Sequence, residues 1–224
     1  MRERHIGLIR VLTTNDPNIL NLHGDILEKQ FPFKIENDCI HGQPKGVYDE
    51  KTHQEAEPKI VELAKEMEQR GLEGIIVSCA ADPGVQVCRE QLTIPVVGAG
   101  SALAAISIAM SDRIGVLTLR NEAPKAVTEL LGSKLISEQG MGVSNTLELM
   151  KASGMEKVIA SVNRLVSKNV EVAALACTGT ATIGAKPKIE AQISNIRVVD
   201  PVLAAGSVMM AYLSGEIGDY PTYE

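Results

Sequence analysis

The stretch GIIVSCAADP, residues 74–83, decides the fold class of this 224-residue chain. Three consecutive β-branched residues, Ile75 to Val77, are apolar, so a strand here would bury both of its faces. Strands of this kind occur where helices cover both faces of a parallel sheet. We therefore expect an α/β fold, with Cys79 where a buried strand runs out into small residues.

Outward from this stretch, short β-branched runs alternate with longer amphipathic runs. Strands are expected at 6–13, 33–40, 74–80, 94–98, 113–119, 134–138, 170–177 and 196–200. Helices are expected at 19–30, 55–70, 101–110, 122–131 and 202–213, with a further long helix ending near residue 169. In open α/β sheets ligands bind outside the carboxyl ends of the strands, so the residues that end strands are the ones to examine for chemistry.

A second stretch, VAALACTGTAT at residues 172–182, resembles the first. It also places a cysteine, Cys177, where an apolar strand ends in small residues, 98 positions after Cys79. If each half of the chain forms one α/β lobe, the two thiols would face each other across a cleft. Coincidence is the alternative, because buried cysteines are common in apolar strands.

The loops after the two cysteines carry groups suited to anions. Asp82 and Pro83 form a helix-start signal, which predicts a helix N-terminus beside Cys79, where free amides and the helix dipole favour a thiolate. Residues 178–182 supply small side chains, amides and hydroxyls that allow close approach of a ligand. The threonines there are equally compatible with ordinary capping and loop roles.

Two opposed thiols are suited to inverting a carbon next to a carbonyl. One thiolate removes the proton, the other thiol returns a proton on the opposite face, and backbone amides stabilise the enolate between them. Cys79 and Cys177 are therefore the candidate catalytic residues.

Composition limits the alternatives. A net charge of −6, with two Phe, four Tyr and no Trp, argues against nucleic acid as a partner and favours a small polar molecule. The most apolar stretch, 94–110, is interrupted by Pro95, Gly98 and Gly100, so we expect no membrane span. The amino-terminal residues do not form a signal peptide, and four cysteines in a reducing compartment are compatible with a cytoplasmic protein.

Several nucleotide- and metal-binding motifs are incomplete in this sequence. Residues 98–103 begin like a dinucleotide fingerprint but carry Leu103 where its last small residue belongs, and residues 179–186 lack the spacing of a phosphate loop. The four histidines have no metal-ligand spacing, so no metal is expected, and the failed nucleotide motifs give no reason to expect a cofactor. Cys39 and Cys88 are interpreted as packing residues.

Four segments, SCAADPGV (78–85), IPVVGAGSALAA (94–105), RIGVLTL (113–119) and ALACTGTATIG (174–184), resemble motifs of hydantoin racemases within the aspartate/glutamate/hydantoin racemase superfamily. The resemblance spans nearly the whole chain. It implies a pyridoxal-independent racemase that uses Cys79 and Cys177, acts on a substrate such as a 5-substituted hydantoin, and forms a homo-oligomer.

The resemblance also implies an architecture and a set of substrate contacts. Two similar lobes, each a mostly parallel sheet flanked by helices, would enclose the active site in the cleft between them. The first lobe would comprise residues 1–98 plus 206–224, and the second residues 99–205. Substrate contacts are expected from Ala80, Ala81, Gly98, Ser101, Thr118, Thr178 and Gly179.

One departure from the family pattern bears on the substrate. Hydantoin racemases usually carry an Asn-Pro-Asn-Thr-like segment after the first strand, whereas this chain reads IRVLTTND at residues 9–16. Arg10 in that neighbourhood would clamp a substrate carboxylate or, equally, bridge to an acidic side chain. The alternatives to a hydantoin racemase are an aspartate/glutamate-type amino-acid racemase, a maleate-type cis-trans isomerase, and a small-molecule-binding module without catalysis.

Overall fold

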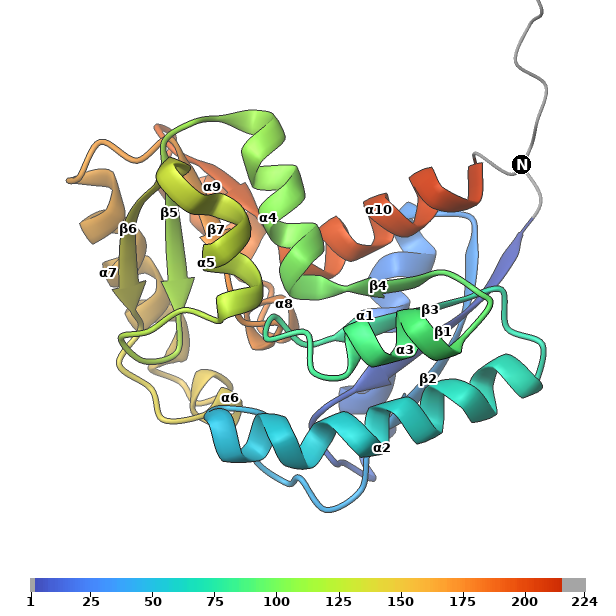
Figure 1. Cartoon of the computed structure of the whole chain (residues 1–224). Coiled ribbons are helices and arrows are strands. Elements are labelled where there is room, and N and C mark those ends of the chain that lie inside the picture. The colour runs from blue at the N-terminus through green and yellow to red at the C-terminus, as the bar shows by residue number, and fades with distance from the viewer. Residues whose placement is uncertain (1–2, 215–224) are drawn as a thin grey trace, which may run out of the picture.

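The computed structural model describes residues 3–214, which form two parallel four-stranded sheets (Figure 1). The strand orders are β2-β1-β3-β4 and β6-β5-β7-β8, so the two halves share one topology. The first sheet contains β1 (Arg4–Arg10), β2 (Phe33–Cys39), β3 (Gly74–Ser78) and β4 (Val96–Gly98). The second contains β5 (Ile114–Thr118), β6 (Leu135–Gly140), β7 (Val172–Leu175) and β8 (Arg197–Val199). The predicted α/β class with two similar lobes is confirmed.

Helices cover the faces of both sheets (Figure 1). They are α1 (Pro17–Gln30), α2 (Glu50–Gln69), α3 (Val85–Gln91), α4 (Ala99–Met110), α5 (Lys125–Leu131), α6 (Thr146–Leu149), α7 (Gly154–Val166), α8 (Gly179–Thr182), α9 (Ala185–Gln192) and α10 (Pro201–Ser214), with a 3₁₀ turn at Gly132–Lys134. None of the helices within residues 3–214 is long and apolar enough to cross a membrane. The expected segment 206–224 of the first lobe extends beyond the described residues from 215 onward.

The lobes share a hydrophobic core. Ile6 and Ile76 of the first sheet belong to the same buried cluster as Val116 and Ala174 of the second, together with side chains of α4 and α10. These two helices pack against each other, and α4 also contacts β4 and β7 (Figure 1). Each lobe has a further cluster of its own on the opposite face of its sheet. The division at residues 98/99 remains a prediction, and the two sheets pack around one shared cluster of buried side chains.

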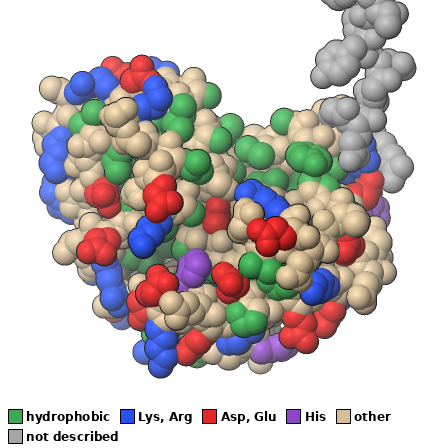
Figure 2. Space-filling model, in the orientation of Figure 1, with side chains coloured by type: hydrophobic (Ala, Val, Ile, Leu, Met, Phe, Trp, Pro, Cys, Tyr) green, Lys and Arg blue, Asp and Glu red, His purple; other side chains and the backbone are tan. Residues whose placement is uncertain are grey.

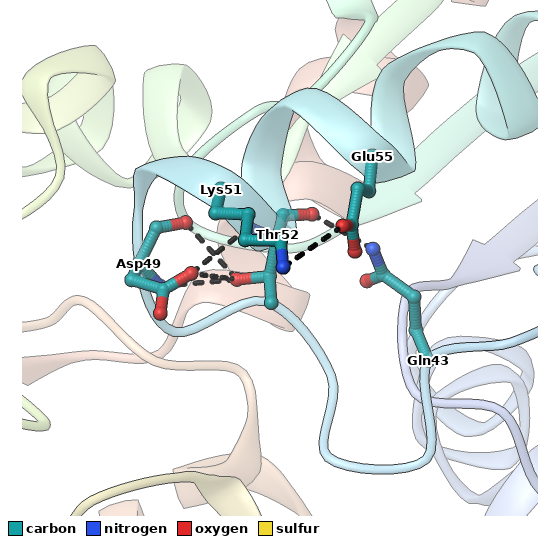
Figure 3. A network of polar contacts seen from close by, with 5 residues as sticks. All are labelled: Gln43, Asp49, Lys51, Thr52 and Glu55. Carbon is teal, nitrogen blue, oxygen red and sulfur yellow. Dashed lines mark hydrogen bonds and ion pairs between the residues drawn. The ribbon is translucent and has the colours of Figure 1, made fainter.

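The segment before α2 is fixed by polar contacts (Figure 3). Asp49 accepts a hydrogen bond from the Thr52 amide at 2.9 Å, and the Thr52 hydroxyl accepts one from the Asp49 amide at 3.1 Å, which completes a capping box. Gln43 is buried and donates to the Thr52 carbonyl at 2.8 Å, while Lys51 pairs with Glu55 at 3.8 Å. This cap starts α2 at Glu50, earlier than the expected residue 55.

Candidate active site

The carboxyl ends of the strands open into a cavity of about 800 Å³ lined by both lobes. Its wall beside the thiols is formed by neutral side chains: Val11, Cys79, Ala80, Ala81, Thr118, Thr146, Ala176, Cys177 and Thr178. Its mouth is formed by Val47, Tyr48, Asp49, Glu50 and His53 from one lobe and by residues 119–126 from the other. Figure 2 shows acidic, basic and histidine side chains intermingled where the first turn of α2 meets the α5 side of the other lobe. The cavity is thus neutral inside and charged at its entrance.

Cys79 and Cys177 occupy equivalent positions in the two lobes. Cys79 follows β3 and Cys177 follows β7, and these are the third strands of the two matching strand orders. Every residue of β3 and β7 is buried, as the apolar pattern predicted. Both thiols are free, 6% exposed, and line the same cavity. The structure therefore brings together the two residues that the sequence singled out.

The surroundings of Cys79 disfavour its charged form. Burial raises the pKa of the Cys79 thiol to about 12, and the negative charges of Asp82 and of an ionised Cys177 also act to raise it. Only a hydrogen bond from the Ala81 amide acts in the opposite direction. The protonated form of Cys79 is therefore favoured.

The surroundings of Cys177 are more favourable to a thiolate. Burial also raises its pKa, but hydrogen bonds from the amides of Gly179 and Thr180, the Thr146 hydroxyl and the charge of Arg10 all lower it. The Thr146 oxygen lies 3.9 Å from the sulfur. A Cβ atom on Gly179 would come within 2.3 Å of the Thr146 side chain and 3.3 Å of the sulfur, so this close approach requires glycine. The loop after Cys177 thus packs closely around its sulfur.

The expected helix start beside Cys79 is wrong. Helix α3 begins at Val85, with Gly84 in the left-handed conformation before it and no side-chain cap. Asp82 instead accepts hydrogen bonds from the amides of Gly100 and Ser101, at 2.6 and 2.7 Å, and so caps α4. Asp82 thus caps a helix whose bonded amide at Gly100 lies 18 positions further along the chain, and not the helix that follows it directly.

The structure places some of the expected substrate contacts in the lining of the cavity and others outside it. Ala80, Ala81, Thr118 and Thr178 line the cavity, whereas Gly98, Ser101, Gly179 and Arg10 are not among its lining residues. A Cβ atom on Gly98 would come within 2.5 Å of the Asp82 carboxyl group. The same carboxyl accepts a hydrogen bond from the Ser101 amide. Both therefore serve the cap of α4.

Arg10 ends β1 and is 3% exposed. Its Nη1 donates to the Ile19 carbonyl at 2.7 Å. Burial lowers its pKa to about 10, while the thiols of Cys39 and Cys177, when ionised, act to raise it. The acidic side chain that we considered as its alternative partner is not found, because none of the ion pairs within residues 3–214 involves Arg10.

A polar bridge between the lobes lies behind the thiols. His23 Nδ1 is 2.8 Å from the Ser78 hydroxyl and its Nε2 is 3.0 Å from that of Thr182, while the Thr178 hydroxyl donates to the Ser78 carbonyl at 3.2 Å. Burial holds the pKa of His23 well below its usual range, and the charge of Arg10 lowers it further. The neutral ring thus connects the residue before Cys79 with the helix after Cys177.

Sequence reasoning missed several residues of this site. His23 was considered only as a metal ligand, and Thr146 lies in a polar segment with no apolar periodicity. At the mouth, Arg120 lies 5.5 Å from the ring centroid of Tyr48 in the other lobe, and His53 Nε2 is 3.2 Å from the Ala81 carbonyl. These contacts join residues far apart in the chain, so no local pattern indicated them.

Comparisons with known proteins agree in one family. The family model described as Asp/Glu/Hydantoin racemase matches residues 33–208. A curated hydantoin racemase of Pseudomonas sp. (strain NS671) is 24% identical over 154 residues, which make up 66% of this chain and 61% of that protein. The match therefore spans less than two thirds of that relative's length.

Solved structures share the fold. Allantoin racemase from Klebsiella pneumoniae superposes with a TM-score of 0.84 at 19% identity, over 95% of this chain and 89% of that one. Allantoin racemase from Pseudomonas fluorescens gives a TM-score of 0.80 at 19% identity, over 95% and 92% of the two chains. At these identities the likeness concerns the fold alone.

Proposed function

Because the chain belongs to the Asp/Glu/Hydantoin racemase family, we propose that it is a cofactor-independent racemase that inverts a carbon next to a carbonyl by proton transfer between Cys79 and Cys177. The observation that carries this proposal is the pair of free thiols at equivalent strand ends, both lining one cavity. Inversion needs one proton-transfer group on each side of the reacting carbon, and two lobes with matching topology supply one each.

The reaction begins with one cysteine as thiolate and the other as thiol. The thiolate takes the proton from the substrate carbon, and the electrons of the broken C–H bond remain on the substrate as an enolate. The other thiol then gives its proton to the opposite face of that carbon and becomes the thiolate. Ala80, Ala81, Thr118 and Thr178, which line the cavity, are the proposed substrate contacts.

The substrate class that we propose is the 5-substituted hydantoins. The cavity wall beside the thiols carries no charged side chain among the described residues that line it, and its charged groups lie at the mouth. A free amino acid would place an ammonium and a carboxylate next to the thiols without charged partners, which is unfavourable in a buried site. A neutral ring avoids this cost, and its substituent can extend toward the charged mouth.

The test is incubation in heavy water with each enantiomer of a 5-substituted hydantoin and of aspartate. Optical rotation reports inversion, and loss of the α-proton signal reports exchange. We expect inversion with deuterium uptake on the hydantoin and none on aspartate. Inversion of aspartate alone would overturn the substrate class, and absence of exchange on both would favour a maleate-type isomerase or a module that only binds its ligand.

We also propose a cytoplasmic location and a homo-oligomeric state. Four free cysteines are compatible with a reducing compartment. Leu130, Ile136, Leu147, Met150 and Tyr212 are large apolar side chains that the described chain leaves exposed, and subunit contacts would bury some of them. Light scattering of the purified protein tests the oligomeric state.

A further inference from the structure

We infer that His23 is a positioning residue: its buried imidazole joins the strand end before Cys79 to the short helix after Cys177 and so fixes the separation of the two thiols. The consequence for catalysis rests on the proposed two-thiol racemisation. The separation of the thiols is a property of the protein alone and can be measured without any substrate.

Strand pairing does not by itself fix the two cysteines. The paired register ends at Ser78 in β3 and at Leu175 in β7, so neither cysteine has a partner residue on a neighbouring strand. The amides of Cys79 and Cys177 each donate to the carbonyl two residues earlier in the chain, at 2.9 and 2.8 Å. The positions of the thiols therefore depend on how the loops that carry them are held.

The imidazole of His23 contacts both of these regions. His23 is fully buried, its Nδ1 lies 2.8 Å from the hydroxyl of Ser78, and its Nε2 lies 3.0 Å from the hydroxyl of Thr182. A neutral imidazole offers one donor and one acceptor, and a hydroxyl can serve as either, so both contacts form together. Ser78 directly precedes Cys79. One end of the bridge is thus attached to the strand end that carries the first thiol.

The other end of the bridge is attached to the loop of the second thiol. Thr182 ends α8, and the preceding turn of this helix is bound to Cys177, whose carbonyl accepts from the Thr180 amide at 3.0 Å and from its hydroxyl at 2.6 Å. The hydroxyl of Thr178 also donates directly to the Ser78 carbonyl at 3.2 Å. The two loops are therefore joined both to each other and through the histidine.

Helix α1, which carries the histidine, is itself held firmly in the first lobe. Asn37 of β2 fills the space beside Gly24, so that a Cβ atom there would clash with it. A Cβ atom on Gly206 of α10 would come within 2.5 Å of both Leu27 and Phe31 of α1. The two glycines thus allow α1 to pack closely on β2 and α10, and the imidazole projects from a fixed support.

The proposed reaction requires the substrate carbon to lie between the two sulfurs. Misplacement of a reacting group by about 1 Å can slow a reaction by about 100-fold. Neither His23 nor Thr182 is among the described residues that line the cavity. Loss of the bridge should therefore lower kcat and leave KM nearly unchanged.

The test measures the separation of the thiols directly. Bis-methanethiosulfonate cross-linkers with spacers of increasing length are reacted with the wild-type protein. Peptide mass spectrometry then identifies the link between Cys79 and Cys177 and distinguishes it from links to the other two cysteines. We expect a narrow range of spacer lengths to link the two thiols in the wild-type protein, because the bridge holds the loops at one separation.

Variants at the two ends of the bridge make the test specific. Thr182→Val keeps the shape of the side chain and removes one contact, whereas His23→Leu removes both. Both should widen the range of linking spacers, with kcat for hydantoin inversion lower by about tenfold and about 100-fold respectively. His23→Gln, whose amide can still reach Thr182, should recover part of the activity. The double variant should be no slower than His23→Leu, because Thr182 acts through the histidine.

Ser107→Ala is the matched control. It removes a buried hydroxyl that donates to the Leu103 carbonyl at 2.7 Å within α4, and it leaves the bridge intact. We expect this variant to be less stable than the wild-type protein, with an unchanged spacer range and an unchanged kcat. An equal loss of kcat in Ser107→Ala and Thr182→Val would mean that the bridge contributes only to stability, which contradicts a positioning role.

Two further results would overturn the inference. An identical spacer range in Thr182→Val and the wild-type protein would mean that the bridge does not set the separation of the thiols, and this variant decides the question even if His23→Leu does not fold. A raised KM with unchanged kcat would indicate a role in binding substrate. Failure of the racemase proposal is distinguishable: the wild-type protein would exchange no proton on hydantoins, while the spacer range would still widen in the variants.

Discussion

At the scale of single residues, the two thiols are chemically unequal although the fold makes them equivalent. Burial raises the pKa of both, but Cys79 has one group that opposes this effect and Cys177 has four. In the proposed two-thiol mechanism one group begins as base while the other begins as acid, and this difference favours Cys177 as the base. The difference arises from the groups around each sulfur and not from β3 and β7, which are alike.

The Thr146 hydroxyl is the contact that can be removed most simply. Thr146→Val keeps the shape of the side chain but removes the oxygen near the Cys177 sulfur. Loss of about 1 kcal/mol of thiolate stabilisation corresponds to about a fivefold slower exchange of the substrate α-proton at neutral pH. Thr146→Ser, which keeps the hydroxyl, is the matched control. Equal rates for the valine variant and the wild type would exclude this role.

The sequence was sufficient to identify Cys79 and Cys177, because the end of a buried strand is visible as a local pattern. It could not show the charge environment of the thiols. Arg10, Thr146 and Asp82 act on them from other strands and loops, through contacts that depend on the complete fold. The sequence therefore located the two candidate thiols but not the groups that shift their pKa values.

At the scale of elements, the loop from Cys79 to Gly84 is bound to the first turn of α4, although the helix that follows it in the chain is α3. Asp82 lies in this loop with a positive φ of 50°, an unusual conformation for a residue other than glycine. Its carboxylate is bound to the first turn of α4. The strain at Asp82 is thus offset by the cap, and the cap fixes the position of the loop that carries Cys79.

Removing this cap should weaken the protein measurably. Asp82→Ala leaves two amide groups without their acceptor at a buried helix start, so we expect the free energy of unfolding to fall by about 2 kcal/mol or more. Asp16→Ala removes the exposed cap of α1 and should cost about 1 kcal/mol. Urea denaturation of both variants measures the comparison. Equal losses would show that burial of the α4 cap contributes nothing extra.

The elements that sequence patterns predicted and those they missed differ in one physical respect. Strands β3 and β7 and helix α4 are rich in apolar residues over their whole length, so their own sequence indicates them. The short helix α8 is the run Gly-Thr-Ala-Thr, which is not an apolar run, and the Thr180 hydroxyl donates to the Cys177 carbonyl before it. Its neighbour α9 was missed for the same reason.

At the scale of the whole molecule, the lobes form one body around a shared core, and the thiols lie near their junction. The buried thiols make stability depend on pH. For Cys79 the pKa rises from an ordinary 9.0 to about 12 in the folded protein. Between these values the unfolded chain loses the proton while the folded chain keeps it, so folding is progressively disfavoured as pH rises above about 9.

Replacing Cys79 tests this linkage. Over that window the ionisation of Cys79 lowers the free energy of unfolding by up to about 1.4 kcal/mol per pH unit. Cys79→Ser should therefore lose less stability than the wild type between neutral pH and about pH 10.5. Chemical denaturation at several pH values provides the comparison. Parallel pH profiles for the two proteins would show that Cys79 ionises normally in the folded state.

The most direct measurement of the two-thiol mechanism is α-proton exchange by Cys79→Ser and Cys177→Ser in heavy water, on each enantiomer of a 5-substituted hydantoin. We predict that both folded variants lose inversion, while Cys79→Ser still exchanges the proton of the enantiomer that faces Cys177. If both variants invert the substrate as fast as the wild-type protein, the thiols are not the proton-transfer groups and the mechanism is wrong.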